Sequence, residues 1–85
     1  MPRTIEISYL EDNTIERKLA ESTAKRIAEL GGLSIITALY FDEYGADGLT
    51  PRIEFPDGTV VDGVPGVRKA LEEDLLPDYV ASTNS

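Results

Sequence analysis

Two pairs of neighbouring acidic residues, Glu11-Asp12 and Asp42-Glu43, come nearest to an arrangement that could do chemistry. Paired carboxylates can serve as general acid and general base, and a group of them can hold a hard cation such as Ca²⁺. The segment from Asp42 to Gly48 lacks the alternating ligand spacing of a calcium-binding loop, however, and acids are ordinary residues of turns and helix starts. We therefore predict no catalytic residue and no bound metal.

The chain contains no cysteine and no histidine. This excludes disulfides, thiol nucleophiles, the usual zinc sites, haem ligation and every acid–base scheme that depends on histidine. The glycines form neither a G-x-G-x-x-G fingerprint nor a P-loop, so no nucleotide-binding motif is present. We expect a protein that is not an enzyme and carries no cofactor.

Sixteen acidic residues against eight basic ones give a net charge of −8. Direct nucleic-acid binding, or binding to an anionic membrane surface, needs clustered Lys and Arg, and here the basic residues are dispersed. The ordinary role of such a charge is solubility, and the alternative is a surface that meets a basic protein. No apolar run is long enough to span a membrane and no signal-peptide pattern is present, so we expect a cytoplasmic protein.

The first half of the chain predicts a strand, a helix and a second strand. Residues 4–9 alternate between apolar and polar side chains, and residues 13–30 place apolar residues at helical spacing between a capping box and Gly31-Gly32. An alternative makes residues 14–20 a hairpin strand that follows a turn at Asp12-Asn13. Residues 33–41 are apolar on both alternating faces, which is typical of a strand covered on each side.

The second half predicts a loop over residues 42–50, a hairpin around Pro56-Asp57-Gly58, and a final helix that ends at Pro77. The order β-α-β-β-β-α predicts a small α/β (α+β) domain with a four-stranded mixed sheet. We expect one domain over residues 1–77 and a flexible tail over residues 78–85.

This pattern resembles the thioredoxin superfamily, particularly its glutaredoxin-like and selenoprotein-W-like members. Residues 5–9 resemble the family's first strand, and Thr50-Pro51, followed by a strand, the Asp57-Gly58 turn and another strand, is similar to the glutaredoxin arrangement. The resemblance implies a thioredoxin-like fold with a cis Thr50-Pro51 bond. It also implies a Cys-x-x-Cys motif at residues 10–13, where Leu10 and Asn13 stand instead, so thiol–disulfide exchange is not possible.

Parallel strands deliver their following loops to one edge of a sheet, which is where ligand sites of α/β sheets occur. We therefore expect Glu11, Asp12, Asp42, Glu43 and Asp47 to be exposed and close together, with Glu16 as a further acid there. The residues that we predict to contact a partner are Leu10, Glu11, Asp12, Asn13, Asp42, Glu43, Tyr44, Asp47 and Pro51.

The favoured hypothesis is a non-catalytic, redox-inactive module that uses this acidic edge to bind another protein. The partner would have a basic surface. An alternative is a small acidic decoy that mimics nucleic acid and occupies the groove of a basic protein, as phage-encoded anti-CRISPR proteins do. An enzyme that uses carboxylates is a third hypothesis. We expect the protein to be a monomer or a weak homodimer.

Overall fold

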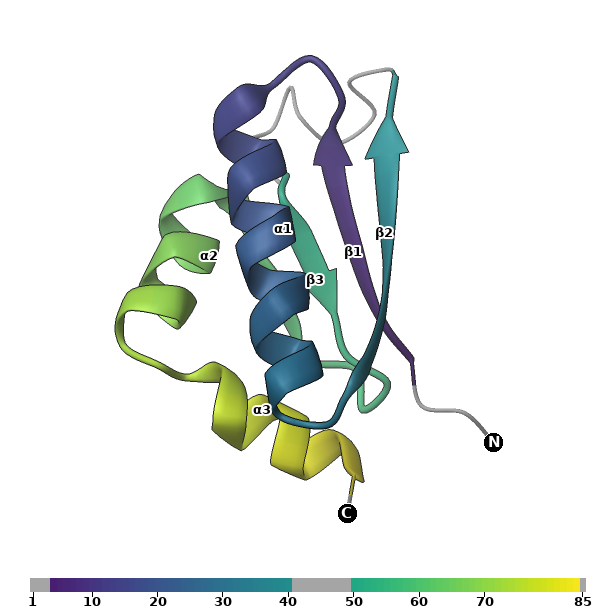
Figure 1. The fold of residues 1–85 in the computed structure, drawn as a ribbon, viewed down its shortest axis with the longest axis vertical. Coiled ribbons are helices and arrows are strands. Elements are labelled where there is room, and N and C mark those ends of the chain that lie inside the picture. Colours follow the sequence, from purple (N-terminus) through teal and green to yellow (C-terminus); the bar gives the residue numbers. More distant parts are fainter. Residues whose placement is uncertain (1–3, 41–49, 85) are drawn as a thin grey trace.

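The computed structural model describes residues 4–40 and 50–84. The elements, in chain order, are β1 (Thr4–Leu10), α1 (Thr14–Glu29), β2 (Leu33–Leu39), β3 (Arg52–Glu54), β4 (Val60–Asp62), α2 (Gly63–Glu72) and α3 (Leu76–Asn84). Figure 1 shows the helices packed together on the same side of the strands. The order matches the one predicted from the sequence, with α3 added at the C-terminal end.

The strands form one mixed sheet in the order β2-β1-β3-β4. β1 and β2 are parallel and in register from Thr4 opposite Leu33 onwards, whereas β3 is antiparallel to both β1 and β4. The predicted four-stranded mixed sheet is therefore confirmed, and its topology is thioredoxin-like. The Thr50–Pro51 peptide bond is cis, as the resemblance implied.

α1 begins and ends as its sequence predicts, which rules out the alternative hairpin strand. The Asn13 side chain accepts a hydrogen bond from the Glu16 amide at 3.0 Å, so that one of the unpaired first-turn donors is satisfied. At the other end Gly31 adopts a φ of 82°, and the Gly32 amide donates to the carbonyl of Ile27 at 2.9 Å. This arrangement is the Schellman motif, which glycine favours because it has no Cβ.

The hydrophobic core lies between the helices and one face of the sheet. Ile5 and Ile7 on β1 are fully buried, whereas Glu6 between them is exposed on the opposite face. The strands contribute Ile5, Ile7 and Ile53 to the core, Phe55 follows directly after β3, and the helices contribute Ala20, Ile27, Val67, Leu76 and Val80. The opposite face has no helical cover among the described residues, so the sheet has one buried and one open face.

The prediction that β2 is covered on both sides is wrong. β2 is an edge strand, and the exposed fractions of Leu33, Ile35 and Ile36 are 61%, 57% and 39%. The reason is topological, because β2 lies at the margin of the sheet and the helices cover only one of its two faces. Apolar residues on alternate positions of both faces therefore do not imply burial of both faces here.

The prediction of a flexible tail over residues 78–85 is corrected by α3. Pro77, read as the end of a helix, lies instead in the first turn of α3, where its missing N–H costs nothing. Val80 and Thr83 are buried, and the ring of Tyr79 lies 5.2 Å from that of Phe55 between centroids. The small polar residues that resemble a frayed end thus belong to a helix that packs on the core.

Candidate functional site

The turn between β1 and α1, where the resemblance would place a redox motif, is held from within by Glu16. One carboxylate oxygen of Glu16 accepts the amide of Leu10 at 3.0 Å, and the other accepts the side-chain amide of Asn13 at 3.2 Å. The Glu16 side chain is only 5% exposed. It therefore does not join the surface acids as expected, but fixes the shape of the turn.

The outer side of this turn combines carboxylates with apolar groups. Asp12 is exposed, Leu10 and Glu11 are half-buried, and Ile15 is 56% exposed. A shallow hollow between them is lined by Leu10, Asp12, Asn13, Thr14 and Ile15. We call the group Leu10, Glu11, Asp12, Asn13 and Ile15 the turn surface.

The exposure of Ile15 differs from the sequence prediction, because Ile15 is one of the apolar residues at helical spacing within residues 13–30, which are typical of a buried helix face. Ile15 lies about 120° around the helix from the buried Ile27, given about 100° per residue. The angular position of Ile15 around the helix, counted over the three turns that separate it from Ile27, is therefore the signal that could have predicted its exposure.

The chemistry that the turn surface offers is binding rather than bond-making. Both atoms of the Asn13 side-chain amide are already engaged with Glu16, at 3.0 and 3.2 Å. The backbone is also tied down, since the Glu11 amide donates to the carbonyl of Leu39 at the end of β2, at 3.0 Å. What remains for a partner is the carboxylates of Glu11 and Asp12 and the apolar surface of Leu10 and Ile15.

The predicted site residues fall into three groups. Residues 10–13 lie together in the turn, with Glu11 and Asp12 at its surface. Asp42, Glu43, Tyr44 and Asp47 lie outside the described residues. Pro51 is fully buried, and the antiparallel register of β1 and β3 extends to place it opposite Tyr9. The side chain of Pro51 therefore packs inside the domain instead of facing a partner.

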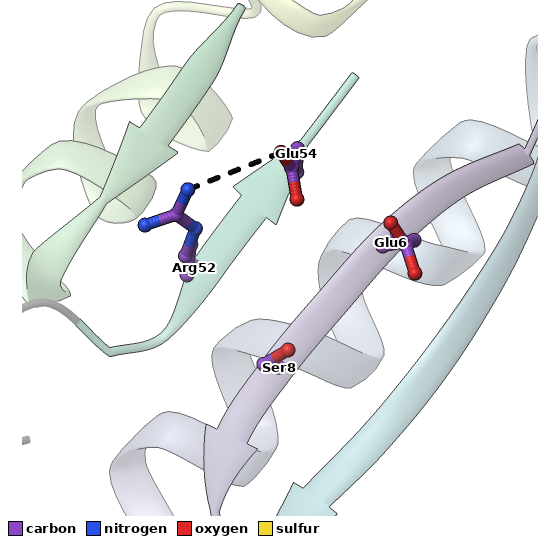
Figure 2. A pocket seen from close by; sticks show the side chains of 4 residues that line it. All are labelled: Glu6, Ser8, Arg52 and Glu54. Carbon is purple, nitrogen blue, oxygen red and sulfur yellow. Dashed lines mark ion pairs between the residues drawn. The ribbon is translucent and has the colours of Figure 1, made fainter. Parts of the chain in front are cut away.

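The open face of the sheet carries a second polar group, which sequence reasoning did not single out. Figure 2 shows Glu6 and Ser8 of β1 beside Arg52 and Glu54 of β3, around a hollow of about 300 Å³. Arg52 Nη2 lies 4.0 Å from Glu54 Oε1, so part of the local charge is compensated internally. The alternation of residues 4–9 and 52–55 contains the signal, because it places these polar side chains on one face.

Two features are absent from residues 4–40 and 50–84. This part of the chain contains no helix with the length and apolar character needed to cross a membrane. Within the same ranges, no three acidic side chains come together in a way that could hold a metal ion.

Comparison of the chain with protein-family models, with curated proteins and with solved structures gave no match. The thioredoxin-like topology is thus a property of the fold, and no activity or partner comes with it from a relative. Function has to be inferred from the residues of the turn surface and of the sheet.

Proposed function

We propose that the chain is a non-catalytic, redox-inactive module that binds another protein through the turn surface. The observation that carries the proposal is the exposure of Ile15 and Asp12 on a turn whose shape is fixed from within by both oxygens of Glu16. A cytoplasmic location is part of the same proposal. Redox inactivity follows from the absence of any thiol in the sequence.

A fixed turn favours binding because little conformational entropy is lost when a partner docks. Exposed Ile15 beside half-buried Leu10 supplies apolar area, and Asp12 at their rim supplies negative charge. The partner that fits is a protein with an apolar groove and Lys or Arg at its edge. Opposite charges at the rim accelerate association, and salt weakens that effect.

The test is a capture experiment with matched variants of the purified chain. A true partner should be retained by the wild type and by Glu21→Lys, which changes an exposed acid on the body of α1. It should be lost, or retained many-fold less, by Asp12→Lys and by Ile15→Ser. Circular dichroism checks that each variant is folded, and a partner retained equally by all four proteins contradicts the proposal.

Kinetics with the captured protein separate the module from the decoy alternative. For the module, Asp12→Lys should slow association mainly at low salt, whereas Ile15→Ser should speed dissociation. A partner that releases at moderate salt and is displaced by nucleic acid assigns the chain to the decoy class instead. A disulfide-reductase assay should show no turnover, and turnover by the pure chain contradicts redox inactivity.

A further inference from the structure

The exposed apolar side chains of the described surface are concentrated at β2. Six large apolar side chains are exposed in residues 4–40 and 50–84, and four of them lie between residues 33 and 40, namely Leu33, Ile35, Ile36 and Tyr40. No charged residue and no proline occurs in β2. Among the described strands only β1 pairs with β2, so its other edge has no strand partner there. Natural edge strands usually carry a charge, a proline or a bulge that prevents further pairing.

The direction of the backbone groups along β2 follows from one hydrogen bond. The carbonyl of Leu39 accepts from the amide of Glu11, so the polar groups of Leu39 point towards β1. Because successive residues of a strand point their N–H and C=O groups to alternate sides, those of Ser34, Ile36 and Ala38 point to the outer edge.

We propose that this edge binds a second copy of the chain, with β2 antiparallel to its counterpart around a two-fold axis at Ile36. The two Ile36 residues then form a hydrogen-bonded pair, and Ser34 of each copy pairs with Ala38 of the other, giving about six backbone hydrogen bonds. On the open face Leu33 lies opposite Leu39, and Ile35 opposite Thr37, in the other copy. Every cross-strand pair is thus apolar, small or hydroxyl-bearing, which favours sheet pairing.

The charge distribution supports a second copy as the occupant. A chain with a net charge of −8 repels its own kind over most of its surface, yet β2 carries no charge at all. Among the described residues, Glu6, which lies opposite Ile35 in β1, is the nearest acid on the open face. In the pair, the two Glu6 residues lie three strand spacings apart, about 14 Å, which exceeds the Debye length of about 8 Å at physiological ionic strength.

The pairing also satisfies the geometry of a closed dimer. A two-fold axis makes the same edge serve both copies, so the association stops at two and builds no fibre. One strand pair buries less than the roughly 1,200 Å² at which stable interfaces begin, so the dimer is weak and depends on concentration.

The decisive experiment compares lysine substitutions at the two edges of the same sheet. Ile35, Glu6, Glu54 and Val60 lie in one row across the open face, with Ile35 on β2 and Val60 on β4. In sedimentation equilibrium, the wild type and Val60→Lys should shift from monomer to dimer as concentration rises, and Ile35→Lys should stay monomeric. A wild type that is monomeric throughout, or a dimer that Ile35→Lys leaves intact, overturns the proposal.

Amide hydrogen exchange tests the register within the same protein. With rising concentration, exchange should slow at the outward-facing amides of Ser34, Ile36 and Ala38. The amides of Ile35 and Thr37, which point towards β1, should not change. Protection that appears on α1 or on the turn surface, without change at Ser34, Ile36 and Ala38, places the interface elsewhere and overturns the pairing.

Discussion

The two edge strands of the sheet are built in opposite ways. β4 has three residues, ends in the charged Asp62 and passes directly into α2. β2 has seven residues with no charge, and in Figure 1 it lies at the margin of the molecule, on the far side of β1 from α2. β4 thus has the shortness and the charge that prevent pairing with another chain, and β2 has neither. The difference teaches that an apolar strand in a small sheet can indicate an interface rather than a core.

The largest expected effect separates a central strand from the β2 edge. Ile53→Ala, at a fully buried position of β3, should lower the free energy of unfolding by about 2–5 kcal/mol, because it removes buried methyl groups and leaves a cavity. Ile35→Ala, at a position 57% exposed, should cost less than about 0.5 kcal/mol in dilute protein. Urea unfolding measures both, and similar losses would show that the monomer already covers β2.

The next effect concerns the turn that anchors the end of β2. Glu16→Ala removes the acceptor of the Leu10 amide and should cost about 1–3 kcal/mol, the penalty for a poorly solvated, unpaired donor. Glu16→Gln is the matched control, since it keeps an oxygen acceptor and should lose less. Amide hydrogen exchange should become faster at Leu10 and at Glu11, whose amide donates to the carbonyl of Leu39 in β2. Exchange of the amides of β4 should stay unchanged. An equal increase in exchange rate at Leu10 and Glu11 and at the amides of β4 would contradict this prediction.

How far the sequence predicts the fold depends on whether the deciding force is local. The cap that the Asn13 side chain forms on α1, the turn at Gly31 and the Asp57-Gly58 hairpin follow from contacts within a few residues, and each is present. The extent of cover on β2 depends on where the helices of other segments pack, which periodicity does not contain. Pro77 is ambiguous for a similar reason, since proline suits both the end of one helix and the first turn of the next.

The candidate site was predictable only in its local part. Residues 10–13 share the turn because they are adjacent in sequence, and the hydrogen bond from the Glu16 amide to the Asn13 side chain was predictable from the helix-start pattern. The reciprocal bond of a capping box does not form, because the Asn13 amide donates to the carbonyl of Leu10. That Glu16 turns inward to bind the Leu10 amide was not readable, because it depends on how β1 enters the helix. Burial of Pro51 likewise depends on packing between distant segments. Glu16 and Pro51, whose side chains face the interior of the domain, were therefore wrongly predicted to lie at the surface.

The smallest effect is a pH dependence at the hairpin that holds β4. The carboxylate of Asp57 accepts the amide of Thr59 at 2.9 Å, and this backbone hydrogen bond lowers the pKa of Asp57 below its ordinary value of 3.8. A pKa lowered by folding stabilises the protein above the ordinary value, and the contribution is lost as pH falls from there through the folded pKa. Asp57→Asn cannot titrate, so the difference in unfolding free energy between wild type and variant should be constant above about pH 5 and shrink towards pH 3.

Because Asp57 is exposed, the effect is small and is resolved only by paired urea titrations at each pH. Parallel loss of stability in the two proteins would show that the turn is held by Gly58, whose φ of 94° suits it, and not by the carboxylate.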